Sequence, residues 1–384
     1  MSLPLETSRL WPNPMQSLTT KLKDRAKELG FDLVGVAGAE PSAFAEEYRE
    51  WISQGMHGEM GYLERNLERR LDSRELMPDA RSILVVGMNY YVAERNENED
   101  EDEDSHVNKN LPAESNPIPS TAPKAVIARY ARGDDYHEVM TAKLRQLLSY
   151  LKEVAGEDAE GKVYVDTGPI LEREVARRAG IGWFGKNTML INSWRGSWFL
   201  LGEIVTNVVL EIDNPAVGGC GTCTKCLDAC PTGAIIEPFK VDSRRCLSYL
   251  TIELKGSIPE EFQAALSADG ARVFGCDICQ EVCPFHVRRA TSTSEPAFQP
   301  REITLNSTVS DLLLLTEDEF RAQFKGSPVK RTKRRGLLRN AIAALCGRQD
   351  EETLHTLKHA LNDPEELVSE QAEKAIKKIP MPSR

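Results

Sequence analysis

Eight of the nine cysteines in this 384-residue chain fall into two interlocking sets. Cys220, Cys223, Cys226 and Cys230 form the run C-x2-C-x2-C-x3-C-P, and a second run, C-x2-C-x3-C-P, follows at Cys276, Cys279 and Cys283, with Cys246 between the two. Two 4Fe–4S clusters require eight thiolates, and in the bacterial ferredoxin spacing the fourth cysteine of one run binds the other cluster. The sequence therefore predicts a fold built around two such clusters.

This crossover assigns four cysteines to each cluster. Cys246 must replace the missing first cysteine of the second run, which requires the chain from Leu247 to Gly275 to loop out and return. Zinc also binds C-x2-C pairs, and disulfides would suit a secreted chain, but neither explains the tripled spacing or the two Cys-Pro endings. The predicted sets are Cys220, Cys223, Cys226 and Cys283 for cluster 1, and Cys230, Cys246, Cys276 and Cys279 for cluster 2.

Length and composition bound the class of protein. A chain of 384 residues is too long for one ordinary core, so two or three domains are expected. The most apolar stretch, Trp198 to Leu210, is interrupted by Glu203 before it reaches membrane-spanning length, and no apolar signal segment precedes a small-residue cleavage site. Cluster thiolates also need a reducing compartment. We expect a soluble cytoplasmic protein with no membrane partner.

Charge is distributed unevenly along the chain. The net charge is −11, and the segment from Glu94 to Asp104 is strongly acidic. Between Lys325 and Arg339 there are only bases among the charged residues. A local field steers a polyanion regardless of the total charge, so this segment is a candidate nucleic-acid contact, although a solvated helix start would look the same. The candidate contacts are Lys330, Arg331, Lys333, Arg334, Arg335 and Arg339.

The hydrophobic pattern divides the chain into four parts. Residues 1–15 look like a loose tail, and residues 16–214 alternate between helical and strand patterns, interrupted by an acidic insertion at 93–123 that has no core to bury. The cysteines lie in a third part, residues 215–290. Residues 291–384 have short amphipathic helical segments with a weak repeat of about 30 residues, as in small helical-repeat arrays.

Two further motifs can be interpreted only from the residues that surround them. Gly180-Ile-Gly-Trp-Phe-Gly185 matches a dinucleotide fingerprint, but a helix precedes it and strand-like residues follow, so we reject nicotinamide binding. Asp135 stands before an amphipathic helix with Glu138 three residues on, which is a capping-box arrangement. A carboxyl there could also donate a proton if burial raised its pKa, although the helix N-terminus acts in the opposite direction.

Taken together, these residues resemble the epoxyqueuosine reductases, cobalamin-dependent enzymes of tRNA queuosine synthesis. Besides the cysteines and the basic segment, the resemblance rests on Arg129-Tyr-Ala-Arg-Gly-Asp-Asp135-Tyr-His, Val165-Asp-Thr-Gly-Pro169, Gly182-Trp-Phe-Gly-Lys-Asn-Thr188 and Leu247-Ser-Tyr-Leu-Thr-Ile-Glu253. It implies an N-terminal cobalamin-binding α/β domain with a nitroreductase-like mixed sheet, a ferredoxin-like two-cluster module and an all-α, HEAT-like C-terminal domain.

The resemblance also implies roles for single residues. Asp135 corresponds to the proposed proton donor to the epoxide oxygen. The substrate is epoxyqueuosine at the wobble position of a tRNA anticodon, an external low-potential donor supplies the electrons, and we expect a monomer. Cobalamin contacts fall by similarity on Arg70, Asp166, Trp183, Lys186, Asn187 and Thr251.

Two other functions remain open at this stage. One is a cobalamin and iron–sulfur reductase of a small molecule, similar to the reductive dehalogenases, although such enzymes have no use for a basic helical tail. The other is a non-catalytic ferredoxin-type electron carrier, which would bind no cobalamin.

Overall fold

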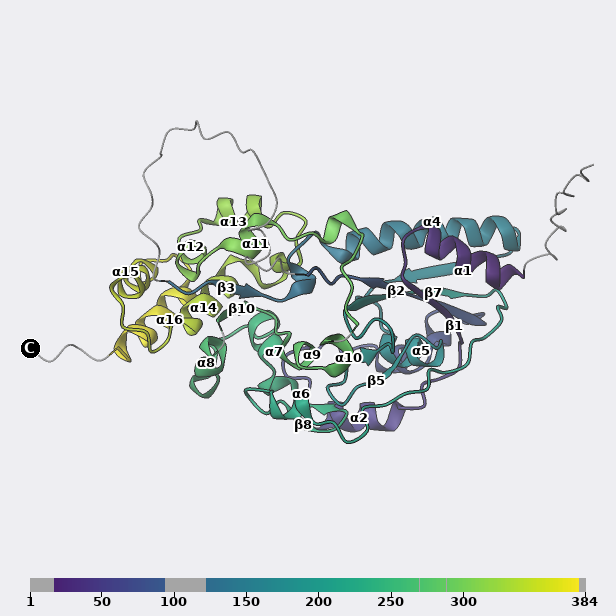
Figure 1. Cartoon of the computed structure of the whole chain (residues 1–384), viewed down its shortest axis with the longest axis horizontal. Helices are drawn as coiled ribbons and strands as arrows, with labels where there is room; N and C mark the ends of the chain where they lie inside the picture. The colour runs from purple at the N-terminus through teal and green to yellow at the C-terminus, as the bar shows by residue number, and fades with distance from the viewer. Residues whose placement is uncertain (1–16, 94–121, 269, 288, 380–384) are drawn as a thin grey trace, which may run out of the picture.

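The computed structural model describes residues 17–93, 122–268, 270–287 and 289–379. The predicted tail and almost all of the predicted acidic insertion lie outside these ranges. The molecule is elongated, with a sheet-containing half at one end, a helical half at the other, and the cysteine-bearing segments along one side between them (Figure 1).

The main sheet has four strands in the order β1-β2-β7-β4. They are β1 (Leu33–Gly38), β2 (Ser82–Asn89), β7 (Phe199–Thr206) and β4 (Gly161–Tyr164), and every neighbouring pair is antiparallel. The prediction of a mixed sheet was therefore wrong for the strands described. The mixed sheet was implied by the family resemblance, whereas β1 and β2 are joined by a long excursion that returns the chain in the opposite direction.

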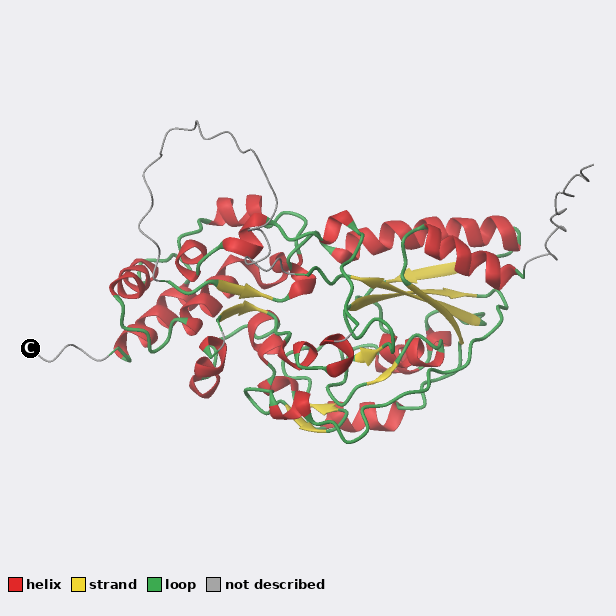
Figure 2. Ribbon diagram, viewed as in Figure 1, coloured by secondary structure: helices red, strands yellow, loops and turns green. Residues whose placement is uncertain are grey.

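Alternating residues of β2 explain why the sheet is covered on both faces. Leu84, Val86 and Met88 pack against α1 (Leu18–Glu28) and α4 (Tyr136–Ala155). Ile83 and Val85 face the other way, toward α5 (Glu172–Arg178). Successive side chains of a strand point to opposite faces, so a continuous apolar run predicts a strand buried on both sides. Figure 2 shows the long helices on one face and shorter elements on the other.

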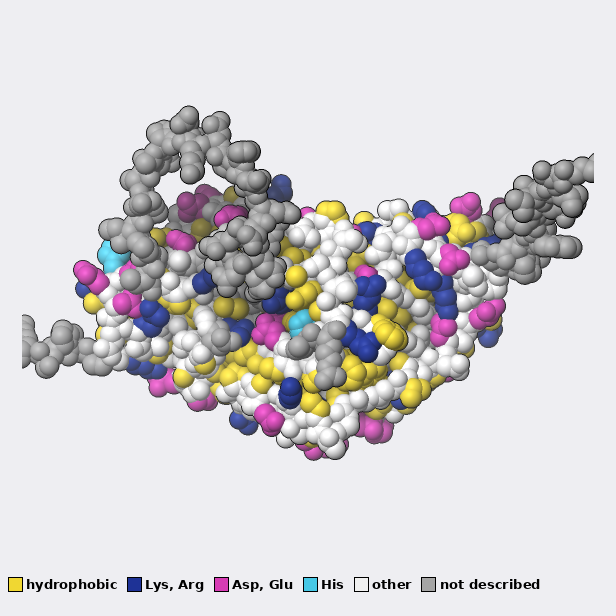
Figure 3. All heavy atoms as spheres, in the orientation of Figure 1, with side chains coloured by type: hydrophobic (Ala, Val, Ile, Leu, Met, Phe, Trp, Pro, Cys, Tyr) yellow, Lys and Arg dark blue, Asp and Glu magenta, His cyan; other side chains and the backbone are white. Residues whose placement is uncertain are grey.

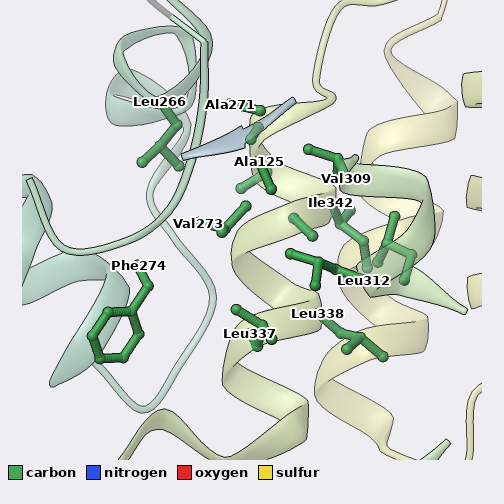
Figure 4. Packing of buried hydrophobic residues seen from close by; sticks show 14 of the residues in the cluster. Ala125, Leu266, Ala271, Val273, Phe274, Val309, Leu312, Leu337, Leu338 and Ile342 are labelled. Carbon is green, nitrogen blue, oxygen red and sulfur yellow. The ribbon is translucent and has the colours of Figure 1, made fainter. Parts of the chain in front are cut away.

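A second core fills the helical half. Strand β3 (Ala125–Ile127) pairs in parallel with β10 (Ala271–Phe274) rather than joining the main sheet. Strand β10 packs against α14 (Lys333–Ala344), and Figure 4 shows residues of both strands in the same core as Leu337, Leu338 and Ile342 of that helix. The core of the helical half thus includes residues from the predicted α/β and cluster parts, among them Ile127 and Val273.

The remaining C-terminal helices surround α14. Thr308 and Thr316 each form a capping box that starts a new helix, so the apolar residues from Val309 to Phe324 belong to two separate short helices. The others are α7 (Leu247–Ile252), α8 (Glu260–Ser267), α11 (Glu302–Asn306), α12 (Val309–Leu313), α13 (Glu317–Gln323), α15 (Glu351–Ala360) and α16 (Glu366–Lys377).

Short elements connect the two halves. The hairpin of β5 (Trp183–Phe184) and β6 (Leu190–Ile191) precedes β7. No helix in the described ranges is long and apolar enough to cross a membrane. The other short elements are α2 (Ala45–Ser53), α3 (Leu67–Leu71), α6 (Lys225–Asp228), β8 (Ile235–Glu237), β9 (Lys240–Val241), α9 (Ile278–Glu281) and α10 (Pro284–Val287).

Candidate active site and cluster-binding region

The first predicted cysteine set comes together in the fold. Burial raises the pKa of both Cys226 and Cys283, and the nearby Cys220 thiol raises each further. Cys223 also lies close enough to raise the pKa of Cys283. The crossover cysteine of the second run therefore lies among the first three cysteines of the first run.

The second set also comes together. Burial raises the pKa of Cys279 well above its usual range, and Cys276 and Cys246 add to the effect. Cys230 lies near Cys246 and influences its pKa. Cys246 immediately precedes α7 and Cys276 follows β10, and the hydroxyl of Thr251 in α7 accepts the N–H of Gly275 at 2.9 Å. The intervening chain thus loops out and returns, as the ligand role of Cys246 requires.

Asp135 caps the N-terminus of α4. Its Oδ1 accepts the backbone N–H of His137 at 3.0 Å, so the cap uses the residue two positions on rather than Glu138. The same oxygen lies 2.8 Å from Nδ1 of His137. Burial raises the pKa of Asp135, but the hydrogen bonds from His137 outweigh it, and the net shift is downward. Asp135 is therefore a carboxylate in the substrate-free protein.

His137 bridges two carboxylates. Its Nδ1 contacts Asp135, and its Nε2 lies 3.4 Å from Oδ2 of Asp166. Burial lowers the pKa of His137, but the two carboxylates outweigh this and raise the pKa to about 9. An imidazolium is thus held at neutral pH between the two aspartates.

Asp166 lies just after β4 in a left-handed backbone conformation, with φ of 54°. Aspartate tolerates this region better than most residues, and such strain gathers at functional sites. Its carboxylate accepts the hydroxyl of Tyr136 at 2.9 Å, yet about half of the side chain remains exposed. Acidic and histidine side chains lie together near the middle of the face in Figure 3, where the two halves meet.

The helical half holds the Asp135 loop in place. Arg301 forms an ion pair with Asp134 at 2.7 Å, and its guanidinium also donates to the carbonyl of Gly326. The N–H of Asp135 donates to the same Gly326 carbonyl at 2.7 Å. The position of Asp135 therefore depends on contacts between residues about 170 to 190 positions apart.

The predicted cobalamin contacts differ in accessibility. Arg70, Asp166 and Lys186 are at least partly exposed, whereas Trp183 and Asn187 are buried. Thr251 is completely buried and its hydroxyl is occupied by Gly275 and Leu247, so the prediction that it contacts cobalamin was wrong. It instead fastens α7 to β10.

Lys186 and Asn187 connect the β5–β6 hairpin to the cysteine segments. Nζ of Lys186 donates to the carbonyls of Gly221 and Cys223 at 2.8 and 2.9 Å. The side-chain amide of Asn187 donates to the carbonyl of Cys279 at 3.0 Å. This hairpin therefore contacts segments that carry both cysteine sets.

The basic segment is only partly a surface. Lys330 and Arg331 are exposed, and their charges lower the pKa of Asp135 and Asp166 respectively, so they border the aspartate site. Lys333 and Arg335 are also exposed.

Arg334 and Arg339 were wrongly predicted as tRNA contacts. Arg334 is buried in an ion pair with Asp363 at 2.5 Å, and Arg339 is 1% exposed and donates to the carbonyls of Leu250, Leu254 and Gly256. A run of basic residues in the sequence does not reveal which of their side chains point inward when one face of the helix is packed against the core.

Replacing Arg334 with alanine should therefore destabilise the fold rather than act on tRNA directly. It leaves the Asp363 carboxylate buried without its partner, which costs about 3–5 kcal/mol. Chemical denaturation measures the loss. Arg335→Ala, one residue on but exposed, should change the free energy of unfolding by less than about 0.5 kcal/mol. Equal effects of the two substitutions would contradict the buried ion pair.

Comparisons with known proteins decide the family. Residues 219–286 match a family model described as a 4Fe-4S double cluster binding domain, and residues 70–167 match one described as "Epoxyqueuosine reductase QueG, DUF1730". An epoxyqueuosine reductase of Xanthomonas campestris pv. campestris is 37% identical over 360 residues, covering 94% of this chain and 95% of that protein. This chain belongs to the epoxyqueuosine reductase family. Its cysteine region is accordingly a double 4Fe–4S cluster domain, with all eight motif cysteines inside the match.

Two solved structures of the family agree with this fold. An epoxyqueuosine reductase with an epoxyqueuosine-modified tRNA-Tyr stem loop has a TM-score of 0.80 and 31% identity, covering 95% of this chain and 91% of that chain. A Bacillus subtilis epoxyqueuosine reductase, whose aspartate-bearing catalytic loop is swung out of the active site, has a TM-score of 0.81 and 32% identity with the same coverage.

The sequence did not indicate a role for three titratable residues in or near the site, His137, Glu172 and Glu203. His137 looked like an ordinary surface histidine, and Glu172 was not singled out. Glu203 was noted only as an interruption of an apolar stretch. That interruption was the available signal, because a lone carboxyl in a strand buried on both faces must have a partner or be neutral.

Proposed function

We propose that this protein reduces epoxyqueuosine to queuosine at the wobble position of tRNA anticodons. The observation that carries the proposal is the His137 bridge between Asp135 and Asp166, located where the sheet half meets the exposed bases Lys330 and Arg331. A proton-donating group thus lies beside a surface that attracts phosphate. Family membership supplies the substrate class.

The electrons would enter through the two clusters. We assign Cys220, Cys223, Cys226 and Cys283 to cluster 1 and the other four motif cysteines to cluster 2, as their neighbours in the fold support. Each cluster ordinarily passes one electron at a time, and an external low-potential donor supplies two. Cys226 influences the pKa of Cys279, so the two cluster sites are adjacent and suited to transfer between them.

Cobalamin fits polar groups of the sheet half that have no partner of their own. The buried Nε of Arg70 and Nε1 of Trp183 have no hydrogen-bond partner among the described residues, and Asp166 presents a half-exposed carboxylate. A corrin carries amide groups around its edge that can pair with such donors and acceptors. Arg70, Asp166, Trp183 and Lys186 would hold it, and Asn187 would act indirectly through the backbone of Cys279. When bound, cobalamin supplies a cobalt that can collect reducing equivalents next to the substrate.

Asp135 would protonate the leaving oxygen. Conversion of an epoxide to an alkene consumes two electrons and two protons and releases the oxygen as water. Asp135 begins as a carboxylate, and the adjacent His137 imidazolium can supply its proton through the 2.8 Å contact. The catalytic loop of the Bacillus subtilis relative also carries an aspartate, which supports this role for Asp135.

The exposed basic residues would hold the anticodon stem loop. The nucleobases of a loop are already unpaired, so placing one of them in a pocket costs less free energy than extracting it from a duplex. Lys330 and Arg331 lie beside the aspartates, and Lys333 and Arg335 extend the basic surface along the start of α14. Phosphate contacts position the RNA, and the pocket must recognise the base.

The double substitution Lys333→Ala and Arg335→Ala should weaken stem-loop binding and make it less salt-dependent. Each lost phosphate contact lowers the slope of log affinity against log salt by about 0.7–0.9. The matched control removes the same charge from α1, at the far end of the sheet half, with Arg25→Ala and Lys27→Ala. An equal loss of affinity in both variants would indicate a general charge effect and contradict a specific contact surface.

Cobalamin binding distinguishes the proposed reductase from a protein that only carries electrons. Anaerobic protein with both clusters assembled should bind about one cobalamin per chain and change its absorption spectrum, and Arg70→Ala should weaken that binding without loss of iron. Absence of any bound corrin at saturating cobalamin would exclude the proposed chemistry.

A further inference from the structure

Glu203 is a buried carboxyl without a hydrogen-bonding donor. It lies in the central part of the main sheet on β7, with its backbone paired to Val85 on one side and Tyr164 on the other. Its side chain is 0% exposed, and neither carboxyl oxygen accepts a hydrogen bond from any residue in the described ranges. Burying an ionised carboxylate in this way is far more costly than burying a neutral acid. Glu203 therefore holds a proton.

The carboxyl of Glu203 faces that of Glu172. Strand alternation places Glu203 on the α5 side of the sheet, and Glu172 is the first residue of α5. Burial raises the pKa of Glu203 well above its usual range, and Glu172 is the next largest cause. Burial followed by the charge of Asp166 raises the pKa of Glu172 to about 8. Two adjacent carboxyls of this kind share a proton, because they cannot both ionise at low cost.

This pair connects to the candidate active site. Oε1 of Glu172 accepts the backbone N–H of Asp166 at 2.5 Å, so the Glu172 side chain reaches the backbone of Asp166. About half of the Asp166 side chain is exposed, and a proton would pass between the two carboxyls through solvent at that position. From Asp166 the row continues to Nε2 of His137 at 3.4 Å, an ion-pair distance at which Nε2 forms no hydrogen bond, and from Nδ1 of His137 to Asp135 at 2.8 Å. A row of five titratable groups thus runs from the sheet interior to the candidate proton donor.

We propose that Glu203 and Glu172 form a proton store that reloads Asp135 through Asp166 and His137. The inference rests on the proposed function. The reaction takes two electrons from the external donor and two protons, and it makes water and an alkene. One of these protons leaves Asp135 for the epoxide oxygen, and the store returns one to Asp135. Bulk water then refills the store. Glu203 and Glu172 do not touch the substrate and act through Asp135.

Neighbouring charges set the pH range of this store. Two acids, one tyrosine and four cations act on the carboxyls of Glu203 and Glu172 from the elements packed around them. The cations favour loss of a proton from the carboxyl nearer to Asp166. Since the pKa of Glu172 is about 8 and that of Glu203 is raised well above its usual range, both carboxyls are protonated below about pH 8 and the pair loses its first proton, from Glu172, as the pH rises through that value. The groups are Asp166, Glu172, Arg173, Arg70, His137, Tyr136 and Arg331.

The test uses Glu203→Gln, which keeps the shape and removes the exchangeable acid. In the full-length protein with both clusters and cobalamin bound and reduced beforehand, a single turnover on epoxyqueuosine-containing stem loop is followed from pH 6 to pH 10. The wild-type rate should fall from about pH 8, whereas the variant should be about tenfold slower at pH 7 and fall only from about pH 9, where His137 loses its proton. Infrared difference spectra of the substrate-free protein should show a protonated-carboxyl signal that decreases as the pH rises through about 8 and is weaker in the variant at neutral pH.

Two further variants keep the test decisive. Glu172→Gln, at a helix end and only half-buried, should reproduce both effects even if Glu203→Gln folds poorly. Glu174→Gln is the matched control, since Glu174 is a buried acid of the same helix that pairs with Arg178 at 2.9 Å instead. Wild-type rate and pH profile in both Glu203→Gln and Glu172→Gln, or no protonated-carboxyl signal, would overturn the proton store alone. No conversion by the wild type would overturn the proposed function instead.

Discussion

Asp135→Asn is expected to lower the rate of epoxide reduction by about a hundredfold to ten-thousandfold. The amide is nearly the same size and can still cap α4 by accepting the N–H of His137 through its oxygen. It cannot carry a proton to the leaving oxygen or anchor the His137 imidazolium with a negative charge. Single-turnover assays with reduced protein measure the rate, and iron content, cobalamin binding and stem-loop affinity should all remain close to those of the wild type.

Asp134→Asn provides the matched control. Asp134 is the adjacent aspartate of the same loop, but its carboxylate pairs with Arg301 on the surface. Exposed ion pairs contribute about 1 kcal/mol or less, so its replacement should slow the reaction far less. Near-normal turnover by Asp135→Asn would remove this residue from the chemistry, and loss of a cofactor in that variant would assign it a structural role.

Cys246→Ser is expected to abolish turnover and remove one cluster. The wild type should hold about eight irons per chain, four in each cubane, and the variant about four. Cys246 is the ligand that the sequence specified least, because it stands outside both runs, yet the fold places it beside Cys230 and Cys279. Iron analysis and electron paramagnetic resonance of the reduced protein distinguish one cluster from two.

Cys346→Ser is the control for this loss. Cys346 is half-buried just after α14, outside both motif runs and outside the matched cluster domain. It should leave about eight irons and normal turnover. Eight irons in Cys246→Ser would contradict our ligand assignment, and a full complement of zinc in the wild type would contradict the clusters themselves.

The sequence predicted the cluster region well because local spacing carries that information. Thiolates that must reach one cubane sit at short fixed intervals, and the Cys-Pro endings mark both runs. Most helices of the sheet half were also predictable, since α1 and α4 have clear apolar stripes and defined ends. Asp135 was recognisable as a helix cap for the same local reason.

Long-range pairing could not be predicted in this way. Nothing in the residues of β3 indicates that it joins β10 rather than the main sheet, because both are short apolar runs. The inward direction of Arg334 and Arg339 depends on what packs against α14. The same limit hid Glu172 and Glu203, which meet only because α5 crosses the face of the sheet on which β7 presents its carboxyl.

The most direct measurement of the central claim is nucleoside mass analysis after reaction with tRNA. The protein, holding both clusters and cobalamin without oxygen, is incubated with a strong reductant and tRNA from cells that lack the reductase. We expect epoxyqueuosine to be replaced by a nucleoside lighter by one oxygen, and we expect this conversion to depend on cobalamin and on Asp135. Unchanged epoxyqueuosine in the presence of fully loaded, reduced protein would contradict it.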